Sequence, residues 1–139
     1  GYAAQLTKNE EAAAYIEACR LNRNLHLCLY SYMDIAIHYD GATPEQIGRF
    51  LENLGLGQHT NAETIYEYLV EEPCNYLKYY LGYLEFLSLK QKAKELWGTD
   101  YSDYLFHKFV LETGPSDFRS LGELVTAHPY PGQNFGNQS

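Results

Sequence analysis

The pattern of hydrophobic and polar positions along the chain predicts an all-α protein. Apolar residues recur three and four positions apart, and no stretch alternates apolar and polar residues between hairpin turns. Glycines, prolines and capping residues divide the pattern into about six helices. The expected helices cover residues 9–38, 43–54, 60–72, 73–97, 103–112 and 117–126.

Two of the expected helices are long. The segment 9–38 starts amphipathic and becomes apolar on nearly every side from Leu25 to Ile37, which is typical of a buried central helix. The segment 73–97 begins at Pro73 and ends before Gly98. We expect the two helices to pack against each other as the core of a helical bundle. The predicted organisation is one α-helical domain over residues 1–126 and an irregular tail over 127–139.

Capping residues set the expected helix starts. The run Thr43–Gln46 matches a capping box with proline at the first helical position. By the same logic we expect Thr60, Ser102 and Ser116 to lie at the starts of later helices.

Composition narrows the function classes. The chain has 139 residues, which fits one domain with a genuine core, and a formal net charge of -8. That charge repels a phosphate backbone, and Lys90, Lys92 and Lys94 spread over two sides of a helix, so nucleic-acid binding is not expected. No apolar run is long enough for a membrane span and no signal peptide is visible. We expect a soluble protein and leave its compartment open.

The residues that would hold a metal or cofactor are missing. The three cysteines are widely spaced, so we expect buried free thiols rather than disulfides or a zinc knuckle. There is no His-Glu-x-x-His run and no glycine-rich phosphate loop. We therefore expect no metal ligands and no cofactor in this chain. The start at Gly1, without methionine, suggests a piece of a longer protein.

Tyrosine is unusually frequent, with fourteen residues, which indicates a half-wet cavity or a contact surface. Tyr76, Tyr79, Tyr80 and Tyr83 share one face of the predicted helix 73–97. They form either an aromatic core stripe or a set of hydroxyl donors for a developing oxyanion.

A polar stripe runs along the apolar half of the first helix. His26, Tyr30, Asp34 and His38 are four residues apart, and Asp34 can contact His38 directly. The pair is either an oriented histidine facing a cleft or an internal pair that locks the helix to its neighbours. His107 lies near an apolar face, where a histidine is usually structural.

Three blocks resemble a known family. They are Met33–Gly41 with the helix start after it, Glu72–Leu84, and Phe106–Pro115. In order and spacing they are similar to the C-terminal part of the bacterial "domain of unknown function 885" family, over about residues 22–125. The sequence departs from the usual pattern at Ala42, where a tryptophan often follows the glycine.

The resemblance implies a fold and a site. Members of the family resemble zinc-dependent peptidases of the all-helical gluzincin kind, whose His-Glu-x-x-His helix and later glutamate lie upstream of the matching region. It implies that Asp34, His38 and Tyr79 line the cleft opposite the metal and stabilise the transition state in the parent protein. We place substrate contacts at Tyr76, Tyr80 and His107.

The leading hypothesis is the C-terminal helical domain of a zinc-dependent peptidase-like protein of uncharacterised function. Such a domain contributes one wall of the active-site cleft and is inactive alone, with zinc only in the full-length parent. Its expected partners are the missing N-terminal catalytic part or a second copy, and a peptide substrate in the parent. The alternative is a non-catalytic helical protein-interaction module. A metal-free enzyme using Asp34 and His38 is disfavoured because no nucleophile accompanies them at a recognisable spacing.

Overall fold

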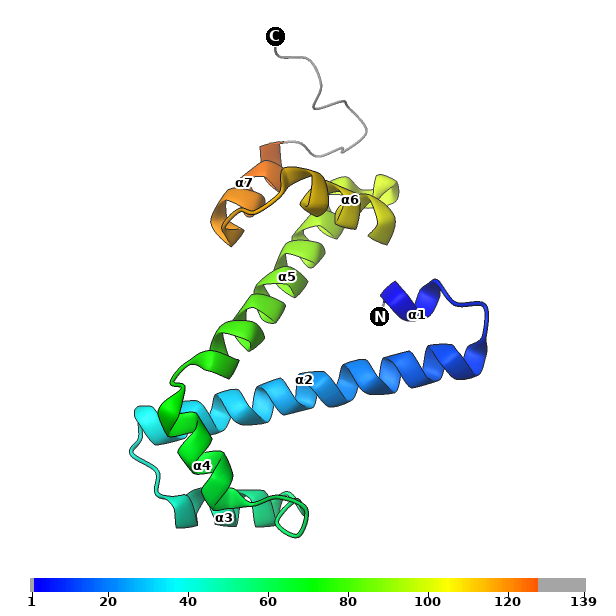
Figure 1. Ribbon diagram of the computed structural model, residues 1–139. Coiled ribbons are helices and arrows are strands. Elements are labelled where there is room, and N and C mark those ends of the chain that lie inside the picture. The colour runs from blue at the N-terminus through cyan, green and yellow to red at the C-terminus, as the bar shows by residue number, and fades with distance from the viewer. Residues whose placement is uncertain (1, 128–139) are drawn as a thin grey trace. The chain divides into compact units, whose positions relative to one another are not determined.

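The computed structural model describes residues 2–127, which form seven α-helices and one short 3-10 helix without any strand (Figure 1). The prediction of an all-α fold is confirmed. Of the expected tail 127–139, Ala127 is the last residue of α7, and residues 128–139 lie outside the described residues. The α-helices are α1 (Tyr2–Gln5), α2 (Glu10–His38), α3 (Pro44–Asn53), α4 (Ala62–Glu71), α5 (Asn75–Trp97), α6 (Asp103–Thr113) and α7 (Phe118–Ala127), with the 3-10 helix η1 (Gly98–Asp100) after α5.

Local capping explains most helix starts. The Asn9 side chain accepts a hydrogen bond from the Ala12 amide, and Ser102 caps α6 in the same way. At α3 the predicted capping box is complete, because the Thr43 amide donates to the Gln46 side chain at 2.8 Å. Each cap satisfies amide groups that lack a partner inside the helix.

Two predicted caps were assigned one residue too early. At α4 the cap is Asn61, whose carboxamide oxygen accepts from two backbone amides of the first turn, whereas the Thr60 hydroxyl donates to the Leu56 carbonyl. At α7 Asp117 accepts from the Ser120 amide at 2.9 Å, in place of the expected Ser116. The side chains of Asn and Asp compete well with Ser and Thr for this role.

The start of α5 also differs from the prediction. The helix begins at Asn75 rather than at Pro73, because Cys74 has a φ of 63°. This left-handed conformation is unfavourable for a residue with a Cβ atom, and it turns the chain sharply between α4 and α5. The turn brings the first residues of α5 next to α2.

The chain divides into two compact units between Leu81 and Gly82, inside α5. In the first unit, α2 contributes Met33 and Ile37 to a core that it shares with α3 and α4. The long helices also meet within this unit, where the ring of Tyr30 on α2 lies 4.5 Å from that of Tyr76 on α5. The core residues of the unit are Met33, Ile37, Ile47, Leu51 and Leu69.

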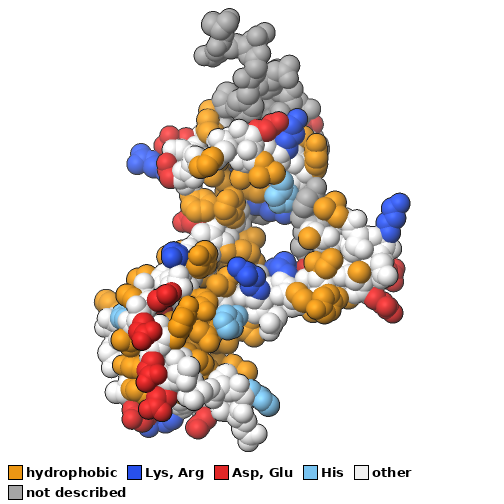
Figure 2. Space-filling model, viewed as in Figure 1, with side chains coloured by type: hydrophobic (Ala, Val, Ile, Leu, Met, Phe, Trp, Pro, Cys, Tyr) orange, Lys and Arg blue, Asp and Glu red, His pale blue; other side chains and the backbone are white. Residues whose placement is uncertain are grey.

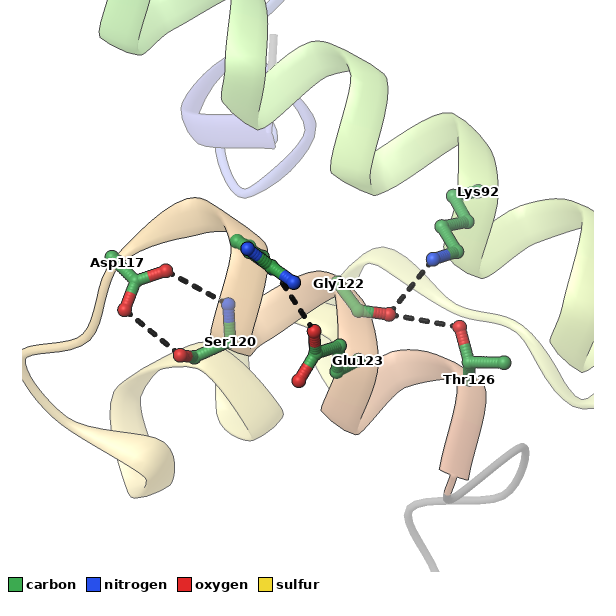
Figure 3. A network of polar contacts seen from close by, with 7 residues as sticks. Lys92, Asp117, Ser120, Gly122, Glu123 and Thr126 are labelled. Carbon is green, nitrogen blue, oxygen red and sulfur yellow. Dashed lines mark hydrogen bonds and ion pairs between the residues drawn. The ribbon is translucent and has the colours of Figure 1, made fainter.

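The second unit has an aromatic core. Its buried residues are spaced three and four positions apart on the rest of α5 and on α6 and α7, as expected for helices that each bury one face. Polar contacts fasten α7 to α5, since Lys92 Nζ donates to the Gly122 carbonyl at 2.8 Å (Figure 3). The core residues are Leu89, Ala93, Trp97, Phe106, Phe109, Leu121 and Val125.

Much apolar surface stays exposed. The expectation that α2 is buried all round from Leu25 to Ile37 is wrong, because Leu25, Tyr32 and Ile35 are 57%, 56% and 44% exposed. A helix with one covered face buries only that face. Figure 2 shows hydrophobic side chains at the surface over the long helices.

The cysteines are free, but the expectation that they are buried is also wrong. Cys19 and Cys74 are exposed, and Cys28 is half-buried. Cys19 and Cys28 lie on α2 outside the core cluster that contains Met33 and Ile37, and Cys74 lies in the turn before α5. None of the helices between residues 2 and 127 combines the length and apolar character needed to cross a bilayer.

Candidate functional site

Asp34 and His38 lie together on α2, as their spacing predicts. The distance from His38 Nε2 to Asp34 Oδ1 is 3.6 Å. The same nitrogen lies 3.0 Å from the Leu69 carbonyl oxygen of α4. A carbonyl oxygen can only accept, so Nε2 carries a proton and donates it to Leu69. The contact ties α2 to α4 and fixes the ring's orientation, while Nδ1 is left for another partner.

The two side chains of this pair differ in environment. The His38 side chain is 33% exposed, whereas that of Asp34 is only 2% exposed. Asp34 Oδ2 and the nearby Ser31 hydroxyl are buried and have no hydrogen-bond partner among the described residues. Burying a carboxylate with incomplete hydrogen bonding is unfavourable. Asp34 is therefore difficult to explain as a stabilising residue.

An aromatic cluster begins at His26, about three turns before His38. His26 stacks on Tyr30 at a centroid distance of 4.2 Å, and both rings contact Tyr76. Tyr68 of α4 approaches Tyr76 from another side, at 6.0 Å. Burial and a hydrogen bond with Tyr68 raise the pKa of Tyr76 to about 12. The Tyr76 hydroxyl is therefore protonated and neutral at physiological pH.

An open pocket of about 510 Å³ lies beside this cluster, within the size range of small-molecule sites. Residues from two turns of α2 and from the start of α5 form its wall. They are Asn22, Arg23, His26, Leu27, Asn75, Tyr76 and Tyr79. The structure thus brings Tyr76 and Tyr79 together with His26, one end of the polar stripe.

Of the other predicted site residues, Tyr79 borders this pocket, whereas Tyr80 and His107 do not line it. Tyr79 is 56% exposed at the pocket, with Lys78 Nζ 5.2 Å from its ring centroid. Tyr80 is half-buried on α5. His107 belongs to the second unit, where its ring packs edge-on against Phe106 at 5.7 Å.

A second pocket lies between α5 and α7 in the second unit. Lys92 and Gly122 line it and hydrogen-bond each other, and Thr126 also donates to the Gly122 carbonyl at 2.8 Å (Figure 3). Arg119 donates to Glu123 on the same helix at 3.2 Å. Because the Lys92 and Arg119 side chains are already paired, this pocket is the weaker candidate for a binding site.

Sequence reasoning missed Arg23 and Asn75, which line the pocket, and the Leu69 carbonyl, which holds His38. Arg23 precedes His26 by three residues and so shares its helix face, a spacing that could have identified it. Asn75 and the Leu69 carbonyl could not be found from spacing, because both reach the site through the packing of α4 and α5 on α2.

The side chains between residues 2 and 127 do not offer a zinc site, because no three His, Cys, Asp or Glu residues gather closely enough to hold a metal ion. His38 and Asp34 supply only two such groups, and Nε2 is occupied by Leu69.

Comparison with known families gives a match over most of the chain. The model of the family described as "Bacterial protein of unknown function (DUF885)" matches residues 1–125. No curated protein and no solved structure matches significantly. Because the matched region covers all seven helices except the last residues of α7, the chain belongs to this bacterial family of unknown function.

Proposed function

We propose that the chain forms one wall of the active site of a zinc-dependent peptidase-like hydrolase and is inactive alone. In this proposal the metal is held upstream of this sequence, as the family resemblance implies, and the described residues do not gather three ligands for one. The observation that carries the proposal is the fixed imidazole of His38, held at one nitrogen by the Leu69 carbonyl and the buried Asp34 carboxylate.

The chemistry of the pair suits a donor to a substrate oxygen. When the imidazole is protonated, its second proton lies on Nδ1, and the Asp34 carboxylate is the anion that faces the ring at 3.6 Å. A donor whose orientation is set before the reaction stabilises developing negative charge without reorganisation. Tyr79 can act similarly, because its exposed hydroxyl makes no hydrogen bond with the described residues.

The test uses the full-length protein encoded by the reading frame that contains this chain. Peptide hydrolysis and zinc content are measured for the wild type and for Tyr79→Phe, with Tyr104→Phe as control because Tyr104 is similarly exposed on α6. We expect Tyr79→Phe to lower turnover by about 10²–10³ with zinc content unchanged. We expect the 139-residue chain alone to show neither hydrolysis nor stoichiometric zinc.

Two results would remove the proposal. One is full activity of the Tyr79→Phe enzyme together with full activity of His38→Gln. The other is stoichiometric zinc on the 139-residue chain alone, because its ligands would then lie within this sequence.

The alternative, a helical interaction module, is favoured by a specific feature of α2. Exposed or half-buried residues follow one another at steps of four and three along the helix, the spacing of a coiled-coil seam. Tyr32 in this row also stacks on Phe50 of α3 at 4.7 Å. The residues of this α2 seam are Leu21, Leu25, Cys28, Tyr32, Ile35 and Tyr39.

The occupant that we propose for the α2 seam is a second copy of the chain. Between Cys19 and Met33 the helix carries no carboxylate, so two copies would not repel each other strongly there. In an antiparallel pair Leu25 would face Ile35 of the other copy, and Leu21 would face Tyr39. Sedimentation should show a dimer that Leu25→Gln weakens and that Leu111→Gln, a change at a still more exposed leucine outside the seam, leaves intact. A monomeric wild type would rule this out.

A further inference from the structure

We propose that the pocket between α2 and α5 binds the carboxylate group of an organic ligand, with Arg23 as its main contact. Three kinds of group support this assignment: an arginine without an ion pair to any described residue, carboxamides, and aromatic rings with hydroxyl groups. Nothing in the proposed function of His38 and Tyr79 requires an anion at this position, so the inference adds a ligand class.

The pocket is locally cationic in an acidic chain. Arg23 forms no ion pair or hydrogen bond with the described residues, whereas its neighbour Arg20 is paired with Glu17. From Cys19 to Met33 α2 contains no carboxylate. Arg23 therefore presents a charge that its own helix does not neutralise, although the protein carries a formal net charge of -8.

Glu72, the residue after α4, has a carboxylate that is already hydrogen-bonded to a residue of the pocket. Glu72 Oε2 accepts a hydrogen bond from the Asn75 amide nitrogen at 2.8 Å. This contact orients the Asn75 side chain, and a carboxamide whose nitrogen is held in this way has its oxygen free for another donor. On the next turn Lys78 adds a second positive charge beside Tyr79.

The aromatic side chains supply the rest of a ligand site. His26 is held by stacking on Tyr30 and by its edge contact with Tyr76. Because the pKa of Tyr76 is raised to about 12, its hydroxyl does not oppose an anion with a charge of its own. An apolar or aromatic group attached to the carboxylate can pack on these rings.

A carboxylate fits better than a phosphate. The planar guanidinium of arginine pairs with a carboxylate through two parallel hydrogen bonds. Arg23 is the one lining residue with a permanent positive charge, and Lys78 is not part of the lining, so the pocket wall balances one negative charge and not two. The volume of about 510 Å³ leaves room for a side chain next to the carboxylate.

If the proposed function holds, the pocket also determines the substrate class. Tyr79 lines the pocket and is also a proposed donor to the substrate. A peptide held by its terminal carboxylate beside Tyr79 would be cleaved near its C-terminal end. The substrate class would then be peptides with a free C-terminus.

The test measures binding to the 139-residue chain by NMR titration. The probes are N-acetyl-alanyl-phenylalanine with a free carboxylate, the same dipeptide as its C-terminal amide, and inorganic phosphate. The variants are Arg23→Gln and, as matched control, Arg49→Gln, which changes an exposed arginine of α3. Loss of one charge-assisted contact is worth about 1.5–3 kcal/mol, or roughly 10–100-fold in affinity.

We expect the free acid to bind and the amide to bind at least roughly tenfold more weakly. Arg23→Gln should weaken the acid by a similar factor, and Arg49→Gln should leave its affinity unchanged. Equal binding of acid and amide, an unaffected Arg23→Gln protein, or no binding of the acid at about 10 mM would overturn the inference. Displacement of the acid by phosphate at equal concentration would overturn the organic carboxylate as the ligand class.

The binding test and the hydrolysis test can fail separately. If the full-length protein hydrolyses peptides while the acid does not bind, the pocket assignment is wrong and the proposed function stands. If the acid binds through Arg23 but the full-length protein is inactive, the pocket stands and the peptidase proposal does not.

Discussion

The two units differ in the hydrogen bonding of one carboxylate each, which is half-buried in the second unit and fully buried in the first. In the second unit Asp103 accepts hydrogen bonds from Lys90 at 2.8 Å and from the Tyr101 hydroxyl at 2.7 Å. In the first unit Asp34 is buried more deeply, and one of its oxygens has no hydrogen-bond partner among the described residues. The first arrangement stabilises a fold, whereas the second is a cost that a fold carries for another reason.

The difference separates a structural part from a functional part. The second unit combines an aromatic core with an Asp103–Lys90 ion pair and a lysine held by a backbone carbonyl, and its buried Trp97 Nε1, which has no hydrogen-bond partner among the described residues, is a neutral rather than a charged group. The first unit contains an oriented histidine, an open pocket, and an arginine that forms no ion pair with residues 2–127. Incompletely paired charges in the folded state are a feature of functional sites, where activity rather than stability determines the residue.

The largest effect should come from the aromatic core of the second unit. Phe109 is 1% exposed and packs edge-on against Trp97 at a centroid distance of 5.7 Å. Phe109→Ala should lower the free energy of unfolding by about 3–5 kcal/mol, measured by circular dichroism in urea. Tyr104→Ala on the exposed side of the same helix should cost far less. Similar losses for the two variants would show that this unit has no stabilising core.

A smaller change in the opposite direction is expected at the turn before α5. Cys74 has a φ of 63°, where a Cβ atom is unfavourable. Cys74→Gly should raise the free energy of unfolding by about 1 kcal/mol. Cys74→Ala removes the thiol but retains the Cβ atom, and it should give no gain. If alanine stabilises the protein as much as glycine does, the strain is not the cause.

The smallest effect concerns pH. Burial works to raise the pKa of Asp103, but hydrogen bonds from Lys90 and Tyr101 outweigh it and hold that pKa below its usual range. A carboxylate with a lowered folded-state pKa stabilises above its unfolded pKa of about 3.9 and loses that contribution as pH falls through the folded value.

In the Asp103→Asn protein, the free energy of unfolding should therefore decrease less steeply as the pH falls through the acid range. Because Asp103 is partly exposed, the effect at neutral pH should stay below about 1 kcal/mol. Urea unfolding across the acid range measures it, with Asp100→Asn, an exposed change in η1, as the control. An unchanged decrease across the acid range in the Asp103→Asn protein would show that the Lys90 and Tyr101 contacts do not contribute.

The sequence predicted the parts of the fold that depend on local signals. The capping box at Thr43 and the break at Gly41 are encoded within a few residues, and the helix bounds agree with them. The left-handed turn at Cys74 has no such signal, since cysteine does not favour that conformation. Likewise, Asp34 and His38 could be paired by their spacing, but the Leu69 carbonyl that fixes the imidazole comes from another helix.

The central claim is that Asp34 serves the orientation of His38 and not the stability of the fold. Urea unfolding of Asp34→Asn in the 139-residue chain tests it most directly. Since the carboxylate is buried with one unpaired oxygen and His38 is one-third exposed, removing its charge should leave the free energy of unfolding unchanged or raise it slightly. A loss of about 3–5 kcal/mol, as expected when a stabilising buried ion pair is broken, would contradict the account.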